Sequence, residues 1–239
     1  MRKQASFGSG RFAVFEELRE RICDGRLPPG SKLLQRHLAD EFGVAVGVVR
    51  EALLELKGCG LITVVPNLGA VVANLNARTI CEALQVREML EGLAARLCCE
   101  RASRSDLREL RALADDLWRR ASHEEPLVNL VAVDQKFHTR IIEISGNGLI
   151  ERFTHSYRAL SPLGQRNRVT IEEHRLFHEQ HLAIVQAIED NLPDDAEQAA
   201  RAHVSTVRRL AEEAFSRGTW QLPWEAAAPP DEKTLSTPR

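Results

Sequence analysis

Apolar residues recur every three or four positions in the N-terminal part of the chain, which is the spacing of an amphipathic helix. The first such stripe covers residues 11–24 and ends at Gly25. Two further helices are predicted over residues 35–42 and 45–59, with Gly43 supplying the turn between them. The pattern therefore predicts one helix followed by a helix-turn-helix.

The period changes after the third predicted helix. Residues 61–65 and 70–73 are short β-branched runs that flank the turn sequence Pro66-Asn67-Leu68-Gly69. Two such runs around a turn of this composition are typical of a β-hairpin. Three helices and a hairpin in this order predict a winged helix-turn-helix over residues 11–74.

The rest of the chain keeps the helical period almost to its end. The predicted helices cover residues 77–102, 103–123, 126–146, 147–165, 172–191 and 193–217. The fold class is therefore mainly α: a winged helix-turn-helix domain, then an all-α antiparallel helical bundle over residues 77–220. Residues 1–10 are expected to be flexible, and the Pro-rich, charged tail over residues 225–239 is expected to be disordered.

Composition adds little to this picture. Aromatic residues make up only 5% of the chain, which suits packed helices, and the net charge of −2 neither favours nor excludes nucleic acid. The five cysteines are odd in number and form no C-x-x-C motif, which favours a reducing cytosol over a disulfide framework. No apolar leader and no run of about 18 apolar residues occurs, so we expect no membrane span and a cytoplasmic location.

Basic residues lie where a helix-turn-helix contacts DNA. The second helix of this motif enters the major groove, and its first turn supplies base contacts. Here that helix contains Arg50 after its first turn and Lys57 near its end, while Arg36 begins the preceding helix. These three side chains are candidate phosphate contacts, although Arg50 has Glu51 and Glu55 nearby as alternative ion-pair partners.

The motifs of this region resemble the GntR family of bacterial regulators. The resemblance rests on LRERICDGRLPPGSKLLQRHLADEFGV, VREALLELKGCGLI and PNLGAVV, in this order over residues 11–74. It implies a winged helix that binds double-stranded DNA as a homodimer on a pseudo-palindromic operator. It also adds the turn residues Val46 and Gly47, and Asn67 of the wing, to the candidate DNA contacts.

This chain departs from the family pattern at the positions that read bases. Val46 replaces the usual Arg, Gly47 replaces a hydroxyl residue, and Leu68 replaces the Arg of the wing. Three interpretations remain open: apolar readout, such as Val46 on a thymine methyl; weak binding mostly through phosphates; or a reading head with little affinity for DNA.

A possible metal site lies in the helical part. Asp134 and His138 are spaced i, i+4 on one helix face, and His181 and His203 lie on two later helices. Such positions can meet in a bundle core, where one carboxylate and three imidazoles suit a divalent transition metal such as Zn, Ni, Mn or Fe. The alternative is a polar core network without metal.

The same segment resembles the FCD effector domain of the FadR-type subgroup over about residues 77–217. The resemblance rests on D-x-x-F-H, Ser145-Gly146-Asn147, H-x-x-I-x-x-A-I and A-x-x-H. It implies that Asp134 and the three histidines hold a metal at the floor of a ligand cavity. His155, His174 and His178 fall outside the motif and are expected at the surface or rim of the domain. For His178, which lies one turn before His181, the alternative is a position in the lining of the cavity.

The effector implied by this resemblance is a small organic acid. Arg87 matches the Arg of R-x-x-L-E in the first helix of such domains, where it can pair with a ligand carboxylate. A pair between Arg87 and Glu91 is the alternative. Arg140, Arg158 and Asn147 are weaker candidates for effector contacts.

These features predict a metabolite-responsive transcriptional regulator that acts as a repressor. We do not expect it to be an enzyme. A metal-dependent enzyme is one alternative, because a metal held by three His and an Asp could activate water. No nucleophile motif or phosphate-binding glycine loop supports it. A regulatory module that has lost its affinity for DNA is the other alternative.

Overall fold

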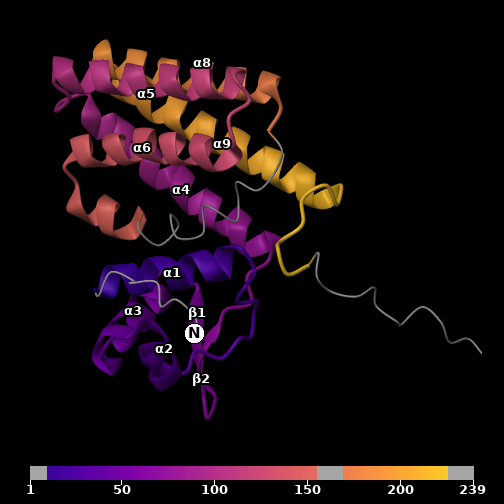
Figure 1. Ribbon diagram of the computed structural model, residues 1–239. Helices are drawn as coiled ribbons and strands as arrows, with labels where there is room; N and C mark the ends of the chain where they lie inside the picture. Colours follow the sequence, from indigo (N-terminus) through magenta and orange to yellow (C-terminus); the bar gives the residue numbers. More distant parts are fainter. Residues whose placement is uncertain (1–9, 155–168, 226–239) are drawn as a thin grey trace, which may run out of the picture. The chain divides into compact units, whose positions relative to one another are not determined.

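The structure is a computed structural model that describes residues 10–154 and 169–225. The chain divides into two compact units, one of residues 1–76 with 221–239 and the other of residues 77–220 (Figure 1). The second half of the predicted 147–165 helix falls outside the described residues, as do the predicted flexible start over residues 1–9 and the predicted tail from residue 226.

The first unit contains three helices and a hairpin in the predicted order. They are α1 (Arg11–Cys23), α2 (Gln35–Phe42), α3 (Val46–Gly58), β1 (Ile62–Val65) and β2 (Gly69–Val72). The apolar faces of the helices meet in a core that includes Phe15, Leu18, Ile22, Val49 and Leu56, all at most 2% exposed. The winged helix-turn-helix predicted from the sequence is confirmed.

Residues with positive φ shape both turns of this unit. Gly43 ends α2 with φ 66°, a conformation that costs glycine little, and so redirects the chain into α3. In the hairpin, Asn67 has φ 63° and Gly69 has φ 81°. Asn tolerates this left-handed region better than most residues, so Asn67 has a backbone role that is independent of DNA.

The second unit is a bundle of long helices. They are α4 (Ala77–Cys98), α5 (Arg104–Ser122), α6 (Leu127–Ser145), α8 (Ile171–Glu189) and α9 (Pro193–Ser216), with a further described helical stretch over residues 148–154. Their contacts close a ring in the order α4, α9, α8, α5, α6 and back to α4 (Figure 1). A closed ring of helices has an interior, and the candidate site lies there.

Local signals explain where these helices begin and end. Ser103 and Asp106 form a reciprocal capping box at the start of α5, and Thr170 and Glu173 form another at the start of α8. Four of the five long helices match their predicted bounds within one or two residues. The exception is α4, which ends at Cys98 rather than at residue 102, because the chain already turns there: the amides of Arg101 and Ala102 both donate to the Cys98 carbonyl.

The core of the bundle combines small and large apolar side chains. Ala94, Ala95 and Ala200 let the helices approach closely, while Phe137 and Ile142 fill the space between them. Within the part of the chain that is described, no helix has the length and apolar character needed to cross a membrane.

Candidate metal centre and effector cavity

Four potential metal ligands from three helices converge inside the bundle. Asp134 and His138 project from one face of α6, His181 comes from α8, and His203 comes from α9. One ligand atom of each lies within 4.8 Å of those of the others. The three imidazoles are at most 4% exposed, so their ring nitrogens are shielded from bulk solvent.

The distances place nitrogen and oxygen atoms around a common centre. His138 Nε2 lies 3.5 Å and His181 Nε2 lies 3.7 Å from Asp134 Oδ1. His181 Nε2 and His203 Nε2 are 3.2 Å apart. These ring nitrogens point at one another and at a carboxylate rather than at separate hydrogen-bond partners.

Groups outside the cluster select the tautomers of two of the histidines. His138 Nδ1 lies 2.9 Å from Glu91 Oε2, and His203 Nδ1 lies 3.1 Å from the side-chain oxygen of Gln180. An Nδ1–H that donates to an oxygen leaves the lone pair on Nε2, which faces the cluster. Neither Glu91 nor Gln180 was assigned this role from the sequence, because each belongs to a different helix from the histidine it orients.

The protonation states suit a metal at two of the three histidines. Burial, reinforced by the neighbouring His138, lowers the pKa of His181 to about 3, and burial lowers the pKa of His203 well below its usual value. Burial also disfavours charge on Asp134, but His138 and His181 outweigh it and hold the pKa of that carboxyl well below its usual range. An anionic carboxylate and neutral imidazoles are the forms in which these groups bind metals.

His138 differs from the other two histidines. Burial lowers its pKa, but Glu91 and Asp134 more than compensate, so the pKa of His138 is raised. Its Nε2 is buried and has no hydrogen-bond partner among the described residues. Since an unpartnered buried nitrogen is costly, this atom fits a role as a metal ligand.

The donor set therefore fits a divalent transition metal. Three imidazole nitrogens and one carboxylate oxygen match the preferences of Zn, Ni, Mn and Fe(II), whereas Mg and Ca prefer oxygen ligands. Four protein ligands fill a tetrahedral site. A metal that also held an effector here would need a fifth or sixth coordination position.

Arg87 and Glu91 extend this polar centre into α4. Arg87 Nε donates to Glu91 Oε1 across 2.8 Å, and the two residues are 6% and 4% exposed. Arg87 and His138 hold the pKa of the Glu91 carboxyl well below its usual range, although burial alone would raise it. The ion pair considered from the sequence as an alternative to ligand contact is thus present, and Arg87 also lines the cavity.

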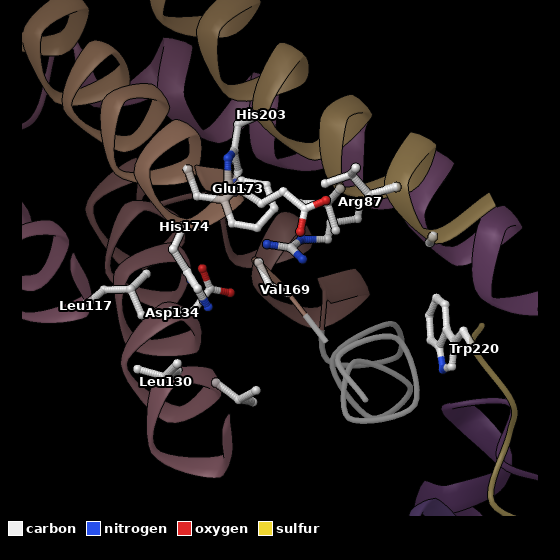
Figure 2. A pocket seen from close by; sticks show the side chains of 14 residues that line it. Arg87, Leu117, Leu130, Asp134, Val169, Glu173, His174, His203 and Trp220 are labelled. Atoms are coloured by element: carbon white, nitrogen blue, oxygen red, sulfur yellow. The ribbon is translucent and has the colours of Figure 1, made fainter. Parts of the chain in front are cut away.

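A cavity in the second unit opens onto the cluster (Figure 2). Asp134, His203 and Arg87 contribute its polar floor. The other described lining residues are mostly apolar and come from several helices: Leu117, Leu130, Val131, Val169, Glu173, His174, Phe177, Val207, Leu210, Ala211 and Trp220.

The flanking histidines are arranged differently from expectation. His174, expected at the surface or rim, lines the cavity two turns before His181, and burial lowers its pKa. His178 is not among the described lining residues: its Nε2 lies 2.9 Å from Asp115, and its ring stacks on Trp118. The seven-residue spacing from His174 to His181 would have revealed this shared helix face. His155 lies outside the described residues.

The weaker effector candidates are not brought to the cavity by the described structure. Arg140 bridges α6 to α5 through Asp106 at 2.5 Å and Glu109 at 2.9 Å. The side-chain oxygen of Asn147 accepts from the amides of Leu149 and Ile150, and so caps the helical stretch that follows. Arg158 lies outside the described residues.

The candidate DNA contacts of the first unit are accessible. Arg36, Arg50 and Lys57 are exposed, and within the described ranges none of them has an ion-pair partner. Glu55, considered as a partner for Arg50, instead lies 3.5 Å from Arg11. The first turn of α3 presents Val46, 43% exposed, next to the exposed Gly47.

Comparison with known proteins agrees with this architecture. Residues 12–72 match the family described as bacterial regulatory proteins, gntR family, and residues 82–206 match the FCD domain. The Nta operon transcriptional regulator of Aminobacter aminovorans is 30% identical over 177 residues, covering 74% of this chain and 82% of the relative. The Glc operon transcriptional activator of Escherichia coli K12 is 28% identical over 223 residues, covering 82% of this chain and 86% of the relative.

A solved structure shares the fold at lower identity. E. coli McbR/YncC superposes with a TM-score of 0.68 at 20% identity, covering 86% of this chain and 98% of that chain. With matches to both family descriptions, in the same order as the two units, the chain belongs to the GntR family of bacterial regulatory proteins with a C-terminal FCD domain, and it is a DNA-binding transcriptional regulator, not an enzyme.

Proposed function

We propose that this regulator is a metal-dependent sensor of a small carboxylate. The observation that carries the proposal is the convergence of Asp134, His138, His181 and His203 in the interior of the bundle. His138 and His203 are oriented through Nδ1 by Glu91 and Gln180, an arrangement typical of metal-ligating imidazoles. A divalent transition metal held there supplies a Lewis-acid centre to which an anionic effector can bind.

The effector head group is proposed to lie between the metal and Arg87. Arg87 lines the same cavity as Asp134 and His203 of the proposed metal site, and a guanidinium is the side chain best suited to pair with a carboxylate. Arg87 donates to Glu91 through Nε, so its guanidinium is held in place by a buried carboxylate. Arg87 thus positions the ligand while Glu91 balances its charge.

The first unit is proposed to contact DNA through a small set of exposed residues. Arg36, Arg50 and Lys57 contact phosphates, Val46 meets a base edge such as a thymine methyl, and Gly47 allows close approach of the backbone. As a homodimer, the protein would place two such units on the half-sites of a pseudo-palindromic operator, in the cytoplasm where the bacterial chromosome lies.

Regulation follows from linkage between the two sites. An effector that binds the DNA-competent and DNA-incompetent states with different affinities shifts the balance between them, and DNA affects effector binding by the same factor. We propose repression, with release of the operator when effector binds. A reporter gene behind the operator should be transcribed more in a strain that lacks the regulator, and lower transcription in that strain contradicts repression.

Elemental analysis of the purified full-length protein is the first test. We expect about one transition-metal ion per chain, lost in the double variant Asp134→Ala/His181→Ala. The double variant Asp115→Ala/His178→Ala is a matched control, because it removes a carboxylate and an imidazole that pair with each other outside the cluster. Absence of metal from the native protein after loading with Zn, Ni, Mn and Fe(II) would overturn the sensor site.

A further inference from the structure

The walls of the effector cavity differ sharply from its floor. Above the floor, the described lining is dominated by aliphatic and aromatic side chains, which come from α5, α6, α8 and α9 and from Trp220 (Figure 2). Val131, Phe177, Val207 and Leu210 among them are only half-buried, although they line an interior cavity. These side chains leave apolar area for a ligand to cover.

The polar groups in the lining are largely committed elsewhere. Asp134 and His203 belong to the metal cluster, and Arg87 pairs with Glu91. The Glu173 carboxylate accepts a hydrogen bond of 2.7 Å from the backbone amide of Thr170, as part of the capping box of α8. Beyond the head-group site, two polar groups remain in the described lining: His174, and the indole Nε1–H of Trp220, which is buried and has no hydrogen-bond partner among the described residues.

From this distribution we infer that the effector is a monocarboxylate with a short apolar tail. The inference rests on the proposed carboxylate site and specifies what the rest of the ligand must be. The tail lies along the walls formed by Val131, Phe177 and Leu210, where it replaces water in contact with apolar surface.

Two competing ligand classes fit these walls poorly. A polyhydroxylated acid would bury several hydroxyl groups mostly against aliphatic side chains, and among the described lining residues only His174 and the indole N–H of Trp220 are placed to bond them. A dicarboxylate needs a second cation, but Arg87 is the one cationic side chain among the described lining residues, where Glu173 adds negative charge. Both classes therefore lose more solvation of polar groups than the described lining residues replace.

Three acids of nearly equal size isolate the tail. 3-Methylbutanoate, 3-hydroxybutanoate and succinate share a chain of four carbons. The first two acids carry a methyl or a hydroxyl group on carbon 3, whereas in succinate carbon 4 is itself a second carboxylate. We expect calorimetric titration of the metal-loaded full-length protein to give a Kd for 3-methylbutanoate about tenfold lower than for the other two acids.

A wall variant with a matched control tests where the preference arises. Leu210→Asn places an amide in the wall and should reduce the preference for 3-methylbutanoate to less than about twofold. Leu176→Asn alters an exposed residue of α8 that is not part of the described lining, and should keep the preference. The metal content of both variants, measured alongside, should equal that of the native protein.

The outcomes separate the inference from the function on which it rests. Binding of 3-hydroxybutanoate or succinate as tightly as 3-methylbutanoate overturns the apolar tail and leaves the carboxylate site intact. Failure of all three acids to bind the metal-loaded protein overturns the carboxylate site together with this inference. A preference that survives in Leu210→Asn overturns the assignment of the tail to this wall.

Discussion

Glu91 on α4 faces His138 on α6, with 2.9 Å between its Oε2 and Nδ1 of the imidazole, while its other carboxylate oxygen accepts from Arg87. One buried carboxylate thus touches both a proposed metal ligand and the proposed effector-binding Arg. The two proposed functions of this site, metal binding and effector binding, thus share a single anionic residue.

Replacing Glu91 with Gln should weaken metal binding without removing a ligand. The amide keeps the size of the side chain but loses the charge that holds the His138 Nδ1–H, and loss of such partners lowers metal affinity by about 10- to 100-fold. Competition with a chelating dye measures the change. Glu82→Gln, which removes an exposed carboxylate of α4 paired with Arg78, should have no effect. An unchanged affinity in Glu91→Gln would show that Glu91 does not orient His138.

The metal-free protein should lose stability as the pH falls below about 6.5. The pKa of His181 is lowered to about 3 by burial, so between these values the unfolded chain binds a proton that the folded chain does not. Stability therefore rises with pH in this window, by up to about 1.4 kcal/mol per pH unit for each such histidine.

Other buried titratable groups also change the stability with pH, so they determine the pH range in which His181 can be tested. His203 adds to the slope because its pKa is also lowered, whereas His138 opposes it because its pKa is raised. The depressed pKa values of Asp134 and Glu91 matter only below their unfolded values near pH 4. Urea unfolding between pH 5 and 7 should show a smaller slope in His181→Gln than in the native chain, both treated with chelator. Equal slopes would contradict the assignment.

Phe137 packs against one of the histidines of the cluster. It is fully buried, and its ring centroid lies 4.3 Å from that of His181. Phe137→Ala should lower the free energy of unfolding by about 3–5 kcal/mol because it leaves a cavity in the core. Phe153→Ala, at a site that is 59% exposed, should change it by less than about 0.5 kcal/mol. Chemical unfolding of both variants measures the difference, and similar values for the two would refute the packing role.

We expect the proposed DNA contacts Arg50 and Val46 to affect operator binding in two different ways, the first through affinity and the second through sequence preference. Arg50→Ala should weaken binding to all sequences alike and reduce the slope of log K against log salt by about 0.9, the contribution of one phosphate contact. Arg19→Ala is the control, because the Arg19 guanidinium is already paired with Glu16. Fluorescence anisotropy at several salt concentrations distinguishes the two, and an unchanged salt slope in Arg50→Ala removes it from the interface.

Val46 should instead affect sequence preference. Val46→Arg restores a side chain that can bond guanine in the major groove, and should shift the preferred base at one operator position by about 1–3 kcal/mol. Selection of binding sites from a randomised pool would reveal the shift. The same preference in both proteins would mean that the first turn of α3 does not read bases.

Much of the fold follows from local features of the sequence. Apolar spacing, the capping residues Ser103 and Thr170 and the turn residue Gly43 act over a few neighbouring positions, so they can be recognised without knowledge of the rest of the chain. The end of α4 was misplaced because the Ser103 cap marks where α5 begins and not where the preceding helix stops.

In the candidate site, too, some features follow from local spacing in the sequence and others depend on how the helices pack. Spacing alone places Asp134 and His138 on one face of α6, because residues four apart lie one above the other on a helix. Spacing does not tell which side of α8 or α9 faces them. The sequence offered His181 and His203 as candidates on two later helices, the family resemblance favoured them as ligands, and the structure brings all four residues together.

The sequence by itself determined the order of elements, the family and the helix face that bears Asp134 and His138, since each depends on residues close together in the chain. Tertiary structure decided that Glu91 contacts His138 and that His174 lines the cavity. It also decided that Arg140 pairs with Asp106 and Glu109 and does not line the described cavity. These contacts join helices whose mutual rotation is fixed only by how their apolar faces pack, so no local pattern in the chain records them.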